Sequence, residues 1–132
     1  MELTLGFIGI VTRDMAASLS FYRALGVPVA EGVEGEGHVD ARLADGTVLA
    51  WDTVEVIRSF HPGYVPPEGG HRIALAFRQE RPEDVDALFA RLTDAGYEGA
   101  VRPWDAFWGQ RYATVLDPDG NAVDIFAALP AS

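Results

Sequence analysis

The alternation of apolar and polar residues predicts short strands and two amphipathic helices that occur twice in the same order. Residues 5–12 are mostly apolar and predict a strand. Asp14 can cap a helix in which Leu19 and Tyr22 lie on one face, and Gly26 is placed to end that helix. This first strand and helix open the first half of the chain.

The rest of the first half predicts a hairpin followed by a linker. Residues 27–37 form a connection rich in Gly and Glu, with room for a short strand. Residues 38–43 and 47–52 predict a hairpin around an Ala-Asp-Gly turn. Residues 53–60 are compatible with either a short helix or a loop, and residues 61–70, with three Pro and three Gly, predict a linker.

The second half repeats this order. Residues 72–79 predict a strand, and Pro82 stands at a first-turn position of a helix that Gly96 ends. Residues 98–102 predict a further strand, and residues 103–110 are interpreted as an aromatic loop.

The clearest turn of the chain lies near its end. Residues 117–120 have the sequence Asp-Pro-Asp-Gly. Pro118 sets φ at the second turn position, and Gly120 avoids steric strain at the fourth. The flanking runs 112–116 and 122–126 are rich in β-branched and aromatic residues. A closing hairpin is therefore predicted, and residues 45–51 are a fainter copy of it.

Two β-α-β-β-β modules within one α+β domain of residues 1–132 account for this repeat. Module 1 is predicted at about 1–60, the linker at 61–70 and module 2 at about 71–128. A single module of this kind leaves a sheet edge and one sheet face uncovered, so we expect the two modules to be paired.

Composition narrows the classes of protein to which the chain can belong. With 48% apolar residues the chain can form a core, and no apolar run reaches the roughly 20 residues that a membrane helix needs. The absence of cysteine excludes disulfides and thiolate metal sites. The net charge of −10 argues against a nucleic-acid surface. We expect a cytoplasmic protein without nucleic-acid or membrane partners.

Two stretches of the chain match a known family, residues 13–26, RDMAASLSFYRALG, and residues 117–121, DPDGN. Through them the chain resembles the vicinal oxygen chelate superfamily, which includes glyoxalase I, extradiol dioxygenases, fosfomycin-resistance proteins and bleomycin-resistance proteins. The resemblance implies paired βαβββ modules whose mixed sheet curls around a cleft, and it implies a homodimer.

The resemblance also implies four metal ligands, each His or Glu, at equivalent points of the two modules. Counted by register, these positions are Phe7, Ala50, Ala74 and Asp124. Only Asp124 carries a metal-ligating group, and one carboxylate does not hold a divalent ion. We therefore expect no metal and no cofactor. The three histidines, His38, His61 and His71, are expected to be solvated or cap-bonding, although a site built from His38, His71 and Asp124 remains open.

The aromatic residues suggest what the protein binds. Residues 104–112 hold four rings in nine positions, and flat rings bind flat ligands by stacking and by burying a large area. Trp104 and Trp108 are equally compatible with covering a sheet edge or a dimer seam. The candidate ligand-binding residues are Phe7, Trp51, Asp52, Trp104, Trp108, Tyr112 and Asp124.

These observations favour metal-independent binding and sequestration of a small, partly aromatic molecule, as the resemblance to bleomycin-resistance proteins implies. The alternative is a glyoxalase-like or dioxygenase-like enzyme that uses non-aligned metal ligands or a carboxylate general base, Asp52 or Asp124. A third hypothesis is an accessory domain that acts by dimerising or by docking to a partner.

Overall fold

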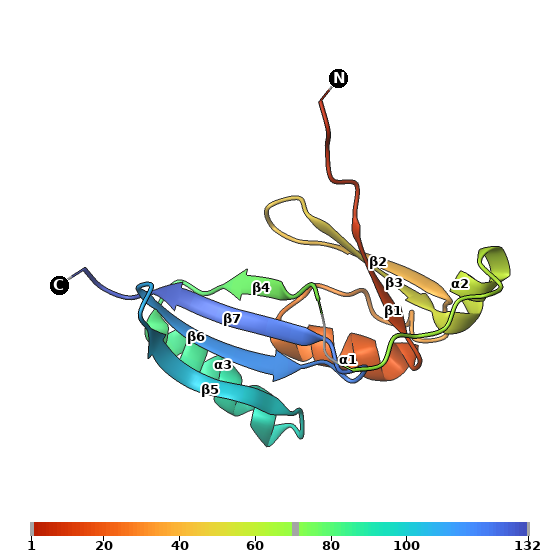
Figure 1. Cartoon of the computed structure of the whole chain (residues 1–132). Helices are drawn as coiled ribbons and strands as arrows, with labels where there is room; N and C mark the ends of the chain where they lie inside the picture. The colour runs from red at the N-terminus through yellow and green to blue at the C-terminus, as the bar shows by residue number, and fades with distance from the viewer. Residues whose placement is uncertain (1, 70–71, 132) are drawn as a thin grey trace. The chain divides into compact units, whose positions relative to one another are not determined.

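The computed structural model of the chain describes residues 2–69 and 72–131, which contain three helices and seven strands. The chain divides into two compact units, Met1–Glu68 and Gly69–Ser132, and each unit has a mixed sheet of its own (Figure 1). The predicted α+β class is confirmed. The boundary falls inside the stretch expected to be a linker, whose last residue, Gly70, lies outside the described residues, as does His71.

Unit 1 contains three strands and two helices. They are β1 (Ile8–Thr12), α1 (Met15–Leu25), β2 (His38–Arg42), β3 (Val48–Thr53) and α2 (Val54–Phe60). The sheet order is β1-β3-β2, with β1 parallel and β2 antiparallel to β3. Residues 53–60, for which the sequence left helix and loop open, form the capped helix α2.

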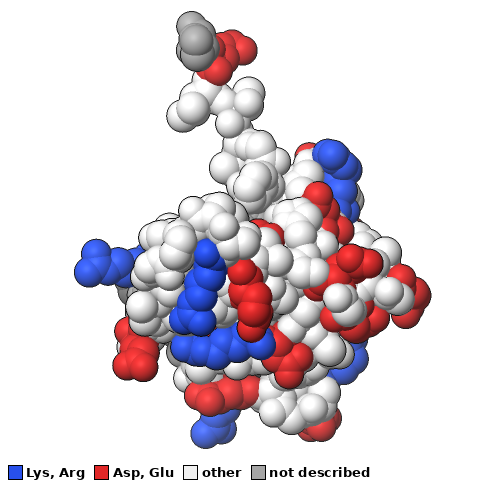
Figure 2. All heavy atoms as spheres, turned by 90° about the vertical axis from the view of Figure 1, so that its right-hand side faces the viewer, with Lys and Arg blue, Asp and Glu red and all other residues white. Residues whose placement is uncertain are grey.

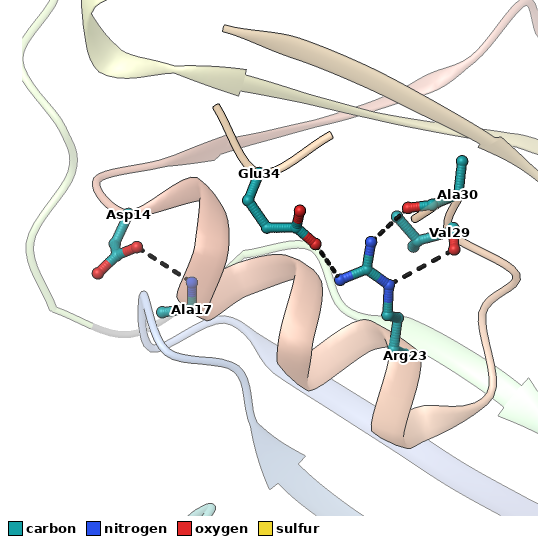
Figure 3. A network of polar contacts seen from close by, with 6 residues as sticks. All are labelled: Asp14, Ala17, Arg23, Val29, Ala30 and Glu34. Atoms are coloured by element: carbon teal, nitrogen blue, oxygen red, sulfur yellow. Dashed lines mark hydrogen bonds and ion pairs between the residues drawn. The ribbon is translucent and has the colours of Figure 1, made fainter. Parts of the chain in front are cut away.

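Helix α1 forms where its capping residues predict it. The Asp14 carboxylate accepts the backbone N–H of Ala17 at 3.0 Å (Figure 3), and Gly26 ends the helix with φ of 119°. The ring of Tyr22 packs edge-on against Trp51 of β3, with 5.3 Å between the centroids. The apolar face of α1 is buried through Met15, Leu19, Phe21, Tyr22 and Leu25.

The connection between α1 and β2 contains no strand, so unit 1 has one strand fewer than the predicted β-α-β-β-β order. The guanidinium of Arg23 donates to the carbonyls of Val29 and Ala30 and pairs with Glu34 at 2.6 Å (Figure 3). The Arg23 side chain thereby occupies two backbone carbonyls that a β-strand in this connection would use for pairing, and it holds the connection against α1.

Unit 2 has the complete predicted order. It consists of β4 (Leu75–Arg78), α3 (Pro82–Asp94), β5 (Gly99–Ala106), β6 (Gln110–Leu116) and β7 (Ala122–Ala128). The sheet order is β4-β7-β6-β5, with β4 parallel to β7 and the other pairs antiparallel.

Helix α3 covers one face of this sheet (Figure 1). It begins with a capping box in which the Asp84 carboxylate accepts the backbone N–H of Arg81 at 3.2 Å. Because β6 and β7 alternate buried and half-exposed residues, only one face of the sheet belongs to the core. The core consists of Val85, Leu88, Leu92, Ala113, Val115, Val123, Ile125 and Ala127.

The closing hairpin forms around the predicted Asp-Pro-Asp-Gly turn. The buried Asp117 carboxylate accepts the backbone N–H groups of Asp119 and Asn121 at 2.9 and 2.8 Å, and Gly120 has φ of 87°. This turn sets the register in which Leu116 lies opposite Ala122.

The stretch interpreted as an aromatic loop, residues 103–110, is instead the end of β5, a turn at residues 107–109 and the start of β6. Two bulges in β5 allow Pro103 to sit inside this edge strand. Within the described part of the chain no helix is long and apolar enough to cross a membrane.

Candidate functional site

The face of the unit 2 sheet opposite α3 carries aromatic and polar side chains. Trp104 of β5 lies opposite Tyr112 of β6, and Tyr112 lies opposite Phe126 of β7, so these three rings share one face. Thr114 and Asp124 form the next pair along the same two strands. We call this surface the aromatic face and define it as Trp104, Trp108, Tyr112, Thr114, Asp124 and Phe126.

The rings of the aromatic face contact one another in series. Trp108, in the β5–β6 turn, lies edge-on to Trp104 and to Tyr112, with centroid distances of 5.4 and 5.5 Å. Tyr112 stacks on Phe126 at 6.0 Å. Trp104 is 42% exposed and Trp108 is 48% exposed. Large apolar rings held in place and left half-exposed are the surface that a flat ligand can cover.

Asp124 lies on this face with both carboxylate oxygens held by hydroxyl groups. Tyr112 donates its O–H to Oδ2 at 2.6 Å, and Thr114 donates its O–H to Oδ1 at 2.8 Å. Burial and this hydrogen bond raise the pKa of Tyr112 to about 12, so the phenol remains a donor at neutral pH. Neither hydroxyl carries a charge, so the hydrogen bonds orient the carboxylate and leave its negative charge uncompensated.

Two arginines lie near the aromatic face, and only one of them, Arg78, lies on it, because it pairs with Phe126 in the β4–β7 ladder. Arg111, on the opposite parity of β6, pairs with Asp105 and with Asp86, the latter at 2.7 Å. Arg78 lies with its guanidinium carbon 5.8 Å from the ring centroid of Phe126. Among the described residues, no ion pair is made by Asp124. Figure 2 likewise shows arginines directly beside acidic residues on the face it displays.

Unit 1 places a histidine between two carboxylates on the sheet face opposite α1. His38 lies across from Asp52 in the β2–β3 ladder, and its Nδ1 is 2.6 Å from Oδ1 of Asp52. Its Nε2 is 2.7 Å from Oδ1 of Asp40. The hydrogen bond with Asp52, above all, raises the pKa of His38. When it is protonated, the imidazole ring therefore supplies an internal counter-ion for the two carboxylates.

A shallow pocket of about 500 Å³ lies beside this histidine. Phe7, predicted to contact a ligand, lines it and is 57% exposed. Trp51, also predicted to do so, is fully buried on the other side of the sheet, and its indole N–H has no hydrogen-bond partner among the described residues. The other lining residues are Gly6, His38, Asp40, Ala41, Arg42 and Val48.

The predicted ligand-binding residues thus fall into three places. Trp104, Trp108, Tyr112 and Asp124 come together on the aromatic face of unit 2. Phe7 and Asp52 lie in unit 1, with Asp52 bound to His38, and Trp51 belongs to the core of that unit.

The positions at which the resemblance implies metal ligands do not fit a divalent ion. Phe7 precedes β1, Ala50 is buried in β3, and Ala74 is an exposed residue before β4. Asp124 alone has ligating atoms, and both of its oxygens accept hydroxyl hydrogen bonds. Among the described residues, which exclude His71, no group of three or more His, Cys, Asp or Glu side chains is arranged to hold a metal.

Three contacts of the candidate site were not predicted in the sequence analysis, although the positions of the turns determine them. Counting outward from the Asp-Pro-Asp-Gly turn pairs Thr114 with Asp124 and Tyr112 with Phe126. Counting outward from the turn at Asp45 pairs His38 with Asp52. The hairpin register, read from each turn, was therefore the available signal.

Comparison with known families gives one match, which extends over most of the chain. Residues 4–125 match the family model described as the glyoxalase/bleomycin resistance protein/dioxygenase superfamily. Among curated proteins no significant match to the sequence is found.

Solved structures with similar folds come from several bacteria. A glyoxalase/bleomycin resistance protein/dioxygenase from Nocardioides has a TM-score of 0.79 and 26% identity, with 100% of this chain and 87% of that chain covered. The protein ATC0852 from Agrobacterium tumefaciens has a TM-score of 0.73 and 27% identity, covering 98% and 100%. A family enzyme from Burkholderia phytofirmans PsJN has a TM-score of 0.81 and 22% identity, covering 93% and 97%, which is evidence for the fold alone.

Proposed function

The chain belongs to the glyoxalase/bleomycin resistance protein/dioxygenase superfamily, and no group of side chains among its described residues fits the implied metal. We propose that it binds and sequesters a small, partly aromatic, antibiotic-like molecule without a metal ion. The ligand is held on the aromatic face of unit 2 and carries a positive charge. The observation that carries this proposal is the Asp124 carboxylate, which is oriented by two hydroxyls and has no ionic partner among the described residues.

The rings supply the contact area for such a ligand. A flat molecule lying against Trp104 and Trp108 buries apolar surface that is now in contact with water. The indole N–H of Trp108 donates to Oε1 of Gln110 at 2.8 Å, which fixes the ring before a ligand arrives. Binding then costs little side-chain ordering.

Asp124 supplies the charge selectivity. A carboxylate that is partly withdrawn from water and has no ion pair carries a desolvation cost, and an organic cation offsets part of that cost when it binds. The same cation gains further attraction from the faces of the neighbouring rings. The net charge of −10 raises the local concentration of cations around the whole molecule.

Titration calorimetry with a charged and an uncharged probe of the same shape tests the proposal. The probes are 9-aminoacridine, which is cationic at neutral pH, and acridine, which is neutral there, each with a metal chelator present. The wild-type protein should prefer the cation by roughly tenfold, the effect of about 1.4 kcal/mol from one partly exposed charge contact. Asp124→Asn should remove that preference, and Trp108→Ala should weaken the binding of both probes to the same extent.

A matched control is Asp105→Asn, because Asp105 is a carboxylate of the same sheet that is already paired with Arg111. It should leave the preference for the cation unchanged. Equal binding of the two probes by the wild-type protein, or binding that appears only when a divalent metal is added, would contradict the proposal.

The enzymatic alternative has one observation in its favour. Asp52 contacts an imidazole beside the unit 1 pocket, and a carboxylate–histidine pair is an arrangement used for proton transfer. Chemical conversion of a bound molecule that Asp52→Asn abolishes would favour the enzyme. Recovery of the molecule unchanged after prolonged incubation would favour sequestration. A homodimer and a cytoplasmic location remain predictions.

A further inference from the structure

Arg78 ends a row of side chains that crosses all the strands of the unit 2 sheet (Figure 1). The β4–β7 ladder pairs Arg78 with Phe126, and the β6–β7 ladder pairs Phe126 with Tyr112. The β5–β6 ladder then pairs Tyr112 with Trp104. The row therefore consists of three aromatic rings with a guanidinium at its β4 end, and it lies entirely within unit 2.

The guanidinium of Arg78 is held by a ring and not by an acid of the same unit. Its central carbon lies 5.8 Å from the ring centroid of Phe126, a distance at which an arginine is attracted to the face of a ring. None of the ion pairs found among the described residues of unit 2 involves Arg78. Because Arg78 is an exposed residue of β4, a ligand can reach its N–H groups without displacing a carboxylate of this unit.

Asp124 lies near Arg78 on the same face of the sheet. Its partner in β4 is Ala76, and Arg78 follows Ala76 by two residues. A strand spacing of about 4.8 Å and a rise of about 3.3 Å per residue put the Cα atoms of Asp124 and Arg78 about 8 Å apart. The side chain of Ala76 is a single methyl group, so no long side chain of β4 shields the carboxylate. The rings of the aromatic face are thus flanked by a negative and a positive group.

We propose that the ligand of the aromatic face is an aromatic zwitterion, with its cationic amine at Asp124 and a carboxylate at Arg78. This inference rests on the proposed function and adds a second charge to the ligand. An amine and a carboxylate on neighbouring atoms, each making a charge-assisted hydrogen bond of about 2.8 Å, span a distance that matches the separation of the two side chains. Aromatic amino acids and their derivatives have this chemistry.

Arg78 changes the kind of cation that the face prefers. A simple cation at Asp124 is repelled by Arg78, because a separation of about 8 Å is no more than one Debye length at physiological ionic strength. A carboxylate on the same ligand replaces this repulsion by attraction, and it can accept two parallel N–H groups of the guanidinium. A simple anion is attracted by Arg78 but is repelled by Asp124 and by the net charge of −10. The zwitterion is the charge type for which both groups are favourable.

Titration calorimetry with four matched indoles tests the two charges separately. Tryptophan carries both charges, tryptamine lacks the carboxylate, indole-3-propionate lacks the amine, and 3-ethylindole lacks both. At neutral pH and with a metal chelator present, the wild-type protein should bind tryptophan about threefold to fivefold more tightly than tryptamine, the effect of one well-oriented exposed ion pair. Indole-3-propionate should bind more weakly than either.

Substitutions of Arg78 should change this order. Arg78→Gln should remove the advantage of tryptophan over tryptamine, and Arg78→Glu should reverse it. Neither should weaken the binding of tryptamine, since both remove a repelling cation. Arg91→Gln is the matched control, because Arg91 is an exposed arginine of α3, which covers the other face of the sheet. It removes the same charge and should keep the advantage, and thermal melting checks that each variant is folded.

Two results would overturn the inference. The first is a wild-type protein that binds tryptophan no more tightly than tryptamine. The second is an advantage of tryptophan that survives Arg78→Gln, or that Arg91→Gln removes to the same extent, which would assign it to the overall charge. The proposed function fails by a different result, equal binding of tryptamine and 3-ethylindole, which concerns Asp124 and not Arg78.

Discussion

Removing the phenolic hydroxyl of Tyr112 isolates the hydrogen bond that orients Asp124. Tyr112→Phe keeps the ring that stacks on Phe126 and meets Trp108, and it deletes only the O–H that donates to Asp124 at 2.6 Å. The substitution therefore separates the polar contribution of this residue from its packing.

The expected cost follows from the chemistry of the pair. Hydrogen bonds to charged groups contribute roughly 1.5–3 kcal/mol to stability. Asp124 is only half-buried and keeps the Thr114 hydroxyl, so water replaces part of the lost interaction. We expect a loss near the lower limit, about 1.5 kcal/mol, which corresponds to a fall of about 5 °C in melting temperature for a chain of this size.

Urea unfolding followed by circular dichroism measures this loss. Tyr64→Phe is a matched control, because no hydrogen bond from the Tyr64 hydroxyl to the described residues is found; it should change stability by less than about 0.5 kcal/mol. A double-mutant cycle with Asp124→Asn should give a coupling energy of about 1 kcal/mol.

The pH dependence of the same variant supplies an independent check. The folded pKa of Tyr112, about 12, lies above the unfolded value of about 10. A raised pKa contributes stability that is present below pH 10 and is lost as the pH rises through 12. The wild-type advantage over Tyr112→Phe should therefore be constant up to about pH 10 and shrink above it. Equal stabilities at neutral pH would refute the assignment of this hydrogen bond.

Three further changes follow from the structure. His38→Gln should destabilise the protein most in acid, because the raised pKa of His38 contributes stability that is present below about pH 6.5 and is lost as the pH rises through the folded value; urea unfolding at several pH values measures this. Gly99→Ala should cost about 1–3 kcal/mol, since a Cβ there would lie 2.5 Å from an aromatic ring of α3, whereas Gly63→Ala, which meets nothing within 4 Å, should be close to neutral. Thr114→Lys should place a cation beside Asp124 and abolish the calorimetric preference for 9-aminoacridine over acridine, while thermal melting shows the fold intact.

Local chemistry made much of the fold predictable. The cap at Asp14, the left-handed glycine at Gly26 and the Asp117 turn each act within a few residues, so the sequence displays both the groups and the partners they need. The order of elements in unit 2 followed from such signals together with the apolar periodicity.

The failures occurred where a distant side chain decided the backbone. Nothing within residues 27–37 indicates that Arg23, one helix earlier, takes up the carbonyls of Val29 and Ala30. The bulges of β5 depend on its partner strand, so Pro103 and its aromatic neighbours were interpreted as a loop. Hydrogen bonds between backbone groups and residues distant in the sequence cannot be predicted from the local pattern of apolar and polar residues.

The candidate site was predicted by residue type more completely than by contact. The prediction selected aromatic and acidic residues near the last hairpin. Four of the residues selected in this way lie together on the aromatic face. Trp51 was placed among them by its position in a strand, and the structure buries it against Tyr22 because it lies one residue from Asp52 and so faces the other side of the sheet.

The two units differ in the groups that contact the acidic side chains of their sheets. Each carries acidic groups on the sheet face that its helix does not cover. In unit 1 His38 lies between Asp40 and Asp52, and in its protonated form it balances part of their charge. In unit 2 the side chains that hydrogen-bond to Asp124 are the hydroxyls of Tyr112 and Thr114, one to each oxygen, and neither carries a charge. A carboxylate that two hydroxyls orient but that no ion pair neutralises gains more from a cation than from another neutral donor, which is why we assign the selectivity for charge to unit 2.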